Sequence, residues 1–323
     1  MKVIYREEFD RWVAGDRYVR PLVRRLLGRK SPYLSGMQTV VRNFRLGLQR
    51  QGIAHSYNPP MFTVGRSAKV ISFGLGMNGV RGLHRSVPVI AAIGFPYPGE
   101  LPDLCREYNV KRYLQHSRWV LDLARSANVY DPQIFELWPA GIDSDEWKPA
   151  GASRAKPVDV LVYDKILWDR EQAAAQLVRP VREFLAKKGL SVAEVRYGGY
   201  TPDEYKQRLG ECKVMVFLSA HESQGLAYQE ALASDVPVIA WDPGMWLDPA
   251  RLKIGRPHVP ATSVPFFDER CGATFADATG FPDRFEAFFE RHLAGGFAPR
   301  EFILENLTIE KSTSRMLEIY GSI

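Results

Sequence analysis

In the second half of the chain, short apolar runs alternate with segments of helical period. The apolar runs cover 158–163, 193–197, 214–218 and 236–241. The helical segments between them cover 170–188, with a break expected at Pro180, 202–209 and 226–233. Because short apolar runs joined by helices are typical of strands buried on both faces, this order predicts a parallel, doubly wound α/β sheet with right-handed crossovers.

The stretch before the last of these strands carries charge in a loop and in the helix that follows it. The loop reads HESQG over 221–225, and the helix contains Glu230. In an open parallel sheet such a loop lies at the carboxyl end of the strands, where ligands bind. Gly225 lets the backbone approach a ligand and leaves helix amides available to an anion. We therefore expect Glu222 and Glu230 to face a ligand crevice.

The composition is that of a globular protein, and 323 residues suffice for two domains of ordinary size. The three cysteines are widely spaced and form no Cys-x-x-Cys pair. This pattern favours a reducing compartment and argues against a structural zinc or disulfide framework. The first residues do not resemble a signal peptide, and no apolar run is long enough to span a membrane. We therefore expect a cytoplasmic protein.

Positive charge is concentrated in residues 1–50, which contain 12 Lys or Arg and 4 Asp or Glu. Much of the excess lies in residues 17–30, where apolar side chains share one helical face. Two interpretations stay open: a solvated basic face over a packed stripe, or peripheral attachment to an anionic membrane surface or a phosphate-bearing acceptor. No basic–aromatic repeat accompanies the charge, so we expect no nucleic-acid partner.

A second set of apolar runs predicts another sheet in the first half of the chain. The expected strands cover 3–6, 69–73, 87–93, 111–116 and 134–138, and a helix is expected through 40–48, ending at Gln51-Gly52. The Pro, Gly, Ala and Ser residues of 149–153 are typical of a linker. The sequence therefore predicts two α/β domains that meet near residue 150.

Several segments resemble the retaining, nucleotide-sugar-dependent glycosyltransferases of family four. Glu222 and Glu230 match the Glu-x(7)-Glu signature of that family, and Pro237-Val238 follows at the expected spacing. Residues 139–149 (PAGIDSDEWKP) are similar to its domain-joining motif, and 308–320 resembles its terminal helix. The resemblance implies the GT-B architecture, which has two facing Rossmann-like, doubly wound parallel sheets with an interdomain cleft.

The resemblance also implies domain boundaries and residue roles. It places an acceptor-side domain over 1–150, a nucleotide-sugar-binding domain over 151–305 and a helix that crosses back over 306–323. In the family, the first glutamate lies by the transferred sugar and the second holds the donor ribose, which implies these roles for Glu222 and Glu230. The other donor-binding residues implied are His221, Ser223, Gln224, Gly225 and Leu226.

Two cations of the family bind the donor diphosphate, an Arg just after the first strand of the second domain and a Lys five positions later. This chain has Lys165 and Arg170 at that spacing, so the two cation types are exchanged. Cations and helix amides stabilise the charge that grows on a departing diphosphate. We therefore expect neither a metal nor a cofactor.

The acceptor side departs from the family pattern. The family has two glycines before the first long helix, where this chain has only Gly36. The family also has a histidine near the acceptor, whereas the corresponding loops here, one of which contains Gly94, have none. These two glycines mark the acceptor-side loops, but no residue there identifies the acceptor.

The sequence predicts a hexosyltransferase-type glycosyltransferase of glycan biosynthesis. It would move a sugar, with retention and without a metal, from a nucleotide-diphosphate donor to an unknown acceptor. Lipid-linked glycans, polysaccharides, proteins and small molecules stay open as acceptors. The missing histidine keeps open a non-catalytic sugar-nucleotide-binding subunit of a glycosyltransferase complex. A GT-B isomerase is a weaker alternative, because the first half offers no clear general base.

Overall fold

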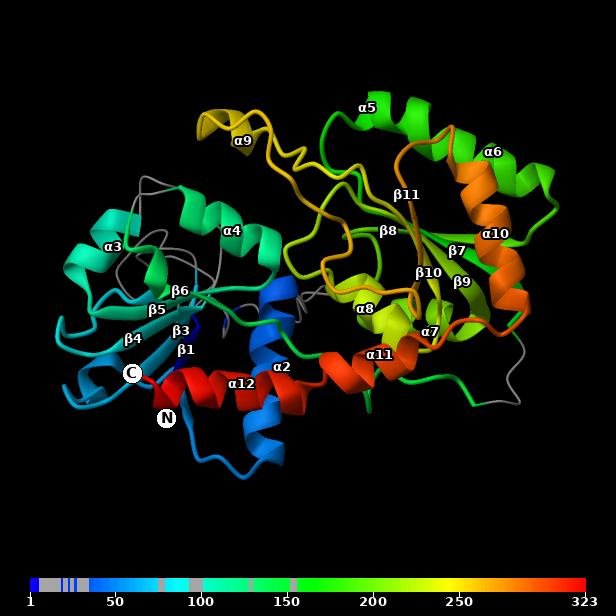
Figure 1. Ribbon diagram of the computed structural model, residues 1–323. Coiled ribbons are helices and arrows are strands. Elements are labelled where there is room, and N and C mark those ends of the chain that lie inside the picture. Colours follow the sequence, from blue (N-terminus) through cyan, green and yellow to red (C-terminus); the bar gives the residue numbers. More distant parts are fainter. Residues whose placement is uncertain are drawn as a thin grey trace. The chain divides into compact units, whose positions relative to one another are not determined.

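The computed structural model describes residues 1–5, 19, 23, 26, 27, 35–74, 79–92, 101–127, 130–151 and 156–323 (Figure 1). The chain forms two compact units. The first unit comprises Met1–His116, Val120–Trp138 and Thr313–Ile323, and the second comprises Ser117–Trp119 and Pro139–Ser312. The domain boundaries at 150 and 305 stay predictions. Among the described residues, no helix has both the length and the apolar character needed to cross a membrane.

The first unit is built on a six-stranded sheet whose neighbouring strands all run parallel, in the order β2-β1-β3-β4-β5-β6. Its strands are β1 (Lys2–Tyr5), β2 (Ser56–Tyr57), β3 (Val70–Phe73), β4 (Val89–Ala92), β5 (Val110–Gln115) and β6 (Phe135–Leu137). Its helices are α2 (Gly36–Arg50), η1 (Met61–Thr63), α3 (Leu101–Glu107), α4 (Arg118–Ser126), η3 (Pro132–Ile134) and the C-terminal part of α12 (Ile309–Gly321).

Helices cover both faces of this sheet. Successive strand residues point to opposite faces, so continuous apolar strands make both faces apolar. On one face, Phe44 of α2 packs on Phe73 of β3, with ring centroids 5.6 Å apart. On the other face, Val70 of β3 shares a core with Leu104 of α3 and Leu121 of α4. The sheet is therefore buried on both sides, as the apolar runs predict.

The second unit is built on a five-stranded parallel sheet in the order β11-β10-β9-β7-β8. Its strands are β7 (Val158–Asp164), β8 (Val192–Arg196), β9 (Cys212–Leu218), β10 (Val238–Trp241) and β11 (Gly272–Phe275). Its helices are α5 (Arg170–Ala173), η4 (Ala174–Val178), α6 (Arg179–Lys187), α7 (Pro202–Glu211), α8 (Leu226–Ala233), α9 (Ala250–Lys253), α10 (Phe281–Leu293), α11 (Pro299–Asn306) and the first turn of α12.

The strand order of the second unit reverses next to β7. The chain passes from β7 outward to β8, returns across β7 to β9, and then continues outward to β10 and β11. Such a reversal leaves a crevice at the carboxyl ends of the two central strands, where open α/β sheets bind ligands. The loops that follow β7 and β9 therefore hold the candidate site.

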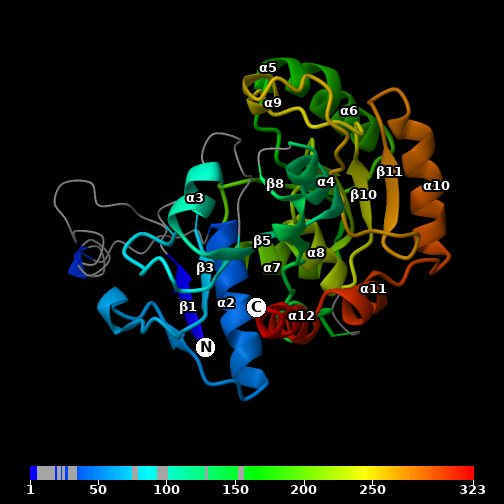
Figure 2. The same cartoon turned by 60° about the vertical axis from the view of Figure 1, so that its left-hand side comes forward.

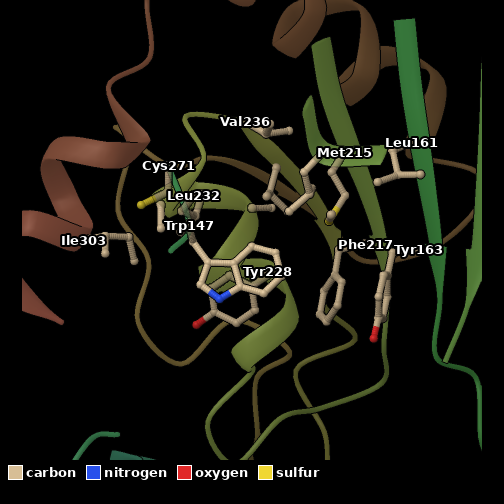
Figure 3. Close-up of a cluster of buried hydrophobic side chains, with 14 of the residues drawn as sticks. Trp147, Leu161, Tyr163, Met215, Phe217, Tyr228, Leu232, Val236, Cys271 and Ile303 are labelled. Atoms are coloured by element: carbon tan, nitrogen blue, oxygen red, sulfur yellow. The ribbon is translucent and has the colours of Figure 1, made fainter. Parts of the chain in front are cut away.

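Helices lie on both faces of the second sheet (Figure 2), and an apolar cluster fills the space on each face. Leu161 and Tyr163 of β7 pack with Tyr228 and Leu232 of α8 on one face, in the cluster that Figure 3 shows. The intervening β7 residue Val162 packs on the opposite face, which α6 and α10 cover. This alternation fixes the register of β7, because a slip of one residue would exchange the two faces.

Two details of the second unit differ from the sequence-based expectations. Pro180 does not end the helix that follows β7, because helical backbone continues without interruption from Arg170 to Lys187. Its missing N–H and its ring disturb the turn before it instead. The irregularity precedes it, as the π-helical segment Ala174–Val178. Strand β11 was not predicted, because Gly272–Phe275 forms no apolar run.

The segment around Gly141 packs tightly against the start of α12. Ile142 N donates to Leu307 O at 2.7 Å, and Ile309 N donates to Ile142 O at 3.2 Å. A Cβ atom on Gly141 would lie 2.5 Å from Ile309 Cα, which is backbone and cannot rotate away. Only glycine fits this position without moving one of the two segments.

We therefore predict that Gly141→Ala lowers the free energy of unfolding by about 2–3 kcal/mol, as overpacking of a closed contact does. Gly65→Ala is the matched control, because a Cβ atom there has no neighbour within 4 Å. Denaturant unfolding followed by circular dichroism measures both. Equal stability of the two variants would contradict the tight packing.

Candidate functional site

The loops after β7 and β9 start side by side. Lys165, the first residue beyond β7, donates its backbone N–H to Leu218 O, the last carbonyl of β9, at 2.8 Å. This bond continues the β7–β9 pairing, in which Asp164 lies opposite Leu218. The side chains of both loops are thereby brought to the switch point of the sheet.

An ion pair joins the two loops. Lys165 Nζ lies 2.7 Å from Glu222 Oε1 and 2.8 Å from Oε2, and Ser219 Oγ donates to Oε1 at 2.8 Å. Glu222 N donates to Thr262 O at 3.0 Å, which fixes its backbone. The Glu222 side chain is only 8% exposed, so its charge depends on these partners. Lys165 Nζ also lies 4.8 Å from the ring centre of Tyr197.

The second cation, Arg170, is bound to a carboxylate at the end of β7. Its Nη1 and Nη2 atoms contact the two oxygens of Asp164, each at 2.5 Å. This hydrogen-bonded contact raises the pKa of Arg170. Asp164 Oδ1 also accepts from Ile166 N at 3.1 Å, which closes the turn after β7. Both predicted cations therefore lie beside the switch point, each paired with an acid.

Gly225 begins α8 in a conformation that glycine favours. Its φ is +82°, and a Cβ atom on it would lie 2.1 Å from Tyr228 Cε1. Tyr228 is buried below the loop, where its hydroxyl bonds Phe266. The glycine predicted for close approach to a ligand thus also makes room for the core beneath the loop.

Gln224 fixes the same loop to the preceding segment. Its Nε2 donates to Ala140 O at 3.1 Å and to Gln229 Oε1 at 2.8 Å, while its Oε1 accepts from Ala140 N at 2.8 Å. Both amide hydrogens are used, and the side chain is buried. The structure therefore places Gln224 as a support of the loop.

Glu230 lies in α8, two turns after the loop, near a tyrosine cluster. Burial raises the pKa of Tyr200, and the charge of Glu230 adds to this effect. The hydroxyls of Tyr163 and Tyr200 lie 2.5 Å apart. Glu230 is half-buried, and its surroundings combine a carboxylate with phenol rings.

His221 is held between aromatic rings. It stacks on Trp168, with ring centroids 5.0 Å apart and planes inclined by 15°, and its edge faces Trp246. Burial, together with the positive charges of Lys165 and Arg251, lowers the pKa of His221 to about 4. Its buried Nδ1 atom has no hydrogen-bond partner among the residues that the structure describes.

Of the remaining predicted residues, two lie in the loop before α8 or at its start, and two belong to the first unit. Ser223 is exposed, and Leu226 is half-buried against the core. Gly36 is the first residue of α2 in the first unit, where Ser35 caps that helix. Gly94 lies outside the described residues, as does most of the basic segment 17–30. The structure therefore gives no side-chain geometry for the acceptor loops.

Sequence reasoning missed three polar residues at strand ends. Arg196 is exposed at the end of β8 and lies opposite Asp164 in the sheet. In the first unit, Gln115 Nε2 and His116 Nε2 are buried without partners among the described residues. The pKa of His116 is lowered by its burial. Their positions at the ends of predicted strands could have identified them as candidate site residues.

His221 offers a direct test of the site's electrostatics. In an NMR titration we predict an imidazole midpoint near pH 4, against the usual 6.5, and a higher midpoint in Arg251→Gln, which removes a nearby positive charge. The unfolded chain then binds more protons between pH 6.5 and 4, so the contribution of His221 to stability falls as the pH falls through that window. A wild-type midpoint near 6.5 would contradict this geometry.

Comparisons with known proteins give structural matches only. No protein-family model and no curated protein sequence matches the chain. Anabaena Alr3699/HepE in complex with UDP and glucose matches with a TM-score of 0.60 at 11% identity, over 100% of both chains. The apo form of the lipopolysaccharide outer core galactosyltransferase WaaB matches at 0.53 and 12% identity, also over 100% of both chains.

The pneumococcal O-GlcNAc transferase GtfA in complex with UDP and GlcNAc matches with a TM-score of 0.52 at 12% identity. That match covers 81% of this chain and 58% of GtfA. At such identities the likeness concerns the fold. The predicted architecture is confirmed: the chain has two parallel-sheet α/β domains that match GT-B glycosyltransferase structures.

Proposed function

We propose that this protein is a glycosyltransferase that moves a hexose from a nucleotide-diphosphate donor to an acceptor, with retention and without a metal. The observation that carries the proposal is the group of charged side chains at the switch point of the second sheet. Lys165, Arg170 and Glu222 converge there beside α8, which carries Glu230.

The cations suit a diphosphate even though each is paired. A guanidinium has five N–H donors, and Asp164 takes two of those on Arg170. The Arg170 side chain is 31% exposed, so a phosphate can reach the remaining donors. Lys165 and the first amides of α8 supply further positive potential for the leaving group. This source of charge is the reason for proposing a metal-independent reaction.

The carboxylates suit the two sugars of such a donor. Glu230 has two oxygens that can accept from neighbouring ribose hydroxyls. Glu222, whose charge Lys165 and Ser219 stabilise, can orient hydroxyls of the transferred sugar and favour positive charge on it in the transition state. Retention of configuration rests on the Glu-x(7)-Glu resemblance.

The structural neighbours make UDP the first donor to test. HepE is described with UDP and glucose and with UDP-glucose, and GtfA with UDP and GlcNAc. WaaB is described as a galactosyltransferase. All three involve hexoses, which supports a UDP-hexose as the donor here.

A non-catalytic sugar-nucleotide-binding subunit is the second candidate. It is favoured by the pairing of both cations with carboxylates, which reduces the charge available to a leaving diphosphate. Turnover of a UDP-hexose that is lost in Glu222→Gln would exclude this candidate.

We propose a cytoplasmic location on the basis of three free cysteines, with residues 17–30 as the proposed contact to an anionic membrane surface.

We predict that UDP raises the melting temperature of the protein and that Glu230→Ala abolishes the rise, because the ribose loses its acceptor. A ligand at a hundred times its Kd stabilises by about 2.7 kcal/mol, which a thermal-shift assay resolves. Glu290→Ala is the matched control, since Glu290 is an exposed helical glutamate of α10.

The absence of any shift with UDP, GDP and ADP would contradict the donor proposal. A shift that survives in Glu230→Ala would contradict the role of Glu230 and leave the donor proposal intact.

A further inference from the structure

A cavity of about 350 Å³ opens next to the candidate site in the second unit. Its walls come from the segment after β7, from η4, and from the ends of β10 and β11. They are mainly apolar and include Ile166, Leu167, Trp168, Leu177, Trp241 and Leu247. This volume lies at the lower end of the range of about 300–1,000 Å³ typical of small-molecule sites.

Two of the polar side chains in the walls are bonded within the protein. Trp241 Nε1 donates to Ala276 O at 2.9 Å. Asp277 Oδ1 accepts from the backbone N–H groups of Thr279 and Gly280, each at 2.9 Å. The other polar side chains, Asp169, Gln172 and Gln176, all come from the helical segment that follows β7. The rest of the lining is apolar and suits a hydrocarbon chain or ring.

The cavity adjoins the position proposed for the transferred sugar. Ile166 in its wall follows Lys165, and Ala220 in its wall lies two residues before Glu222. Trp168 lines the cavity and also stacks on His221. A group that fills the cavity could therefore be joined by a few covalent bonds to a hydroxyl that lies beside the Lys165–Glu222 pair.

The donor is anchored elsewhere. Burial and the charge of Glu230 raise the pKa of Tyr200, so the proposed ribose-binding residue lies near the segment after β8. Strand β8 lies on one side of β7 in the sheet. The cavity lies on the opposite side, at the ends of β10 and β11. The carboxylates of Asp169 and Asp277 on its walls also repel a phosphate. The nucleotide is therefore a poor occupant.

We propose that this cavity binds an uncharged apolar chain or ring of the acceptor, next to the hydroxyl that receives the sugar. The proposal rests on the proposed transfer function and names the acceptor class: a molecule with an apolar group adjoining its reactive hydroxyl. Burial of such a group tightens binding, by about tenfold for every two methylenes.

The test compares octyl β-D-glucoside, below its micelle concentration, with methyl β-D-glucoside. A change in tryptophan fluorescence measures binding, because Trp168 and Trp241 line the cavity and their surroundings change when it is filled. We expect the octyl compound to bind at least about tenfold more tightly, since two buried methylenes suffice for that ratio. Equal binding of the two compounds would overturn the proposal.

Ala173→Leu places extra methyl groups in the cavity from its helical wall and should weaken octyl glucoside binding at least about tenfold. Ala278→Leu does the same from the opposite wall and replaces it if Ala173→Leu does not fold by circular dichroism. Ala175→Leu is the matched control, on the same helical segment but exposed and outside the cavity. Unchanged binding in the cavity-filling variants would overturn the proposal.

Two further arms separate the sources of failure. A UDP-induced thermal shift without octyl glucoside binding overturns the cavity proposal and leaves the donor proposal intact. Octyl glucoside binding without any nucleotide shift overturns the acceptor assignment, because no transfer reaction then supports it. Vesicles of phosphatidylcholine supply hydrocarbon chains without an acceptor. Vesicle binding that Ala173→Leu removes would assign the cavity to membrane lipid and overturn the acceptor assignment.

Discussion

The ion pair between Lys165 and Glu222 ties together the loops that follow the two central strands of the second sheet. Backbone bonds prepare it, because Lys165 N bonds the last carbonyl of β9 and Glu222 N bonds Thr262 O. Removal of the lysine would leave a carboxylate that is 8% exposed, with Ser219 as its one remaining side-chain partner in the part of the chain that the structure describes. Loss of one member of such a pair is far more costly than the net value of the pair. The geometry of the whole candidate site therefore depends on this contact.

The paired cations give the donor-free site little net charge. Lys165 faces Glu222, and Arg170 faces Asp164. A diphosphate would change this balance, since its negatively charged oxygens can accept hydrogen bonds from the remaining N–H donors of both cations. Binding and leaving-group stabilisation then use the same groups, already held in place by the acids. Preorganised donors of this kind stabilise charge that develops in a transition state without the cost of moving them.

The sequence predicted the strands of both sheets except β2 and β11, because buried parallel strands leave apolar runs that need no tertiary information. Helix α8 was predicted residue for residue, since Gly225 marks its start and the next strand follows closely. Strand β11 was missed because Gly272–Phe275 has no apolar run of its own. It is a strand because it pairs with β10. The positions of Lys165 and Glu222 were predictable, but their pairing was not, because it joins loops 57 residues apart. The support role of Gln224 likewise depends on Ala140, which lies 84 residues away.

We propose that the Lys165–Glu222 site recognises a diphosphate. Calorimetric titration with UDP and with uridine tests it most directly, because the two ligands differ only in the diphosphate. The wild-type protein should bind UDP at least about tenfold more tightly than uridine, which corresponds to about 1.4 kcal/mol. In Lys165→Met that preference should largely disappear, whereas Lys187→Met, an exposed lysine at the end of α6, should retain it. An unchanged preference for UDP in Lys165→Met would contradict the account.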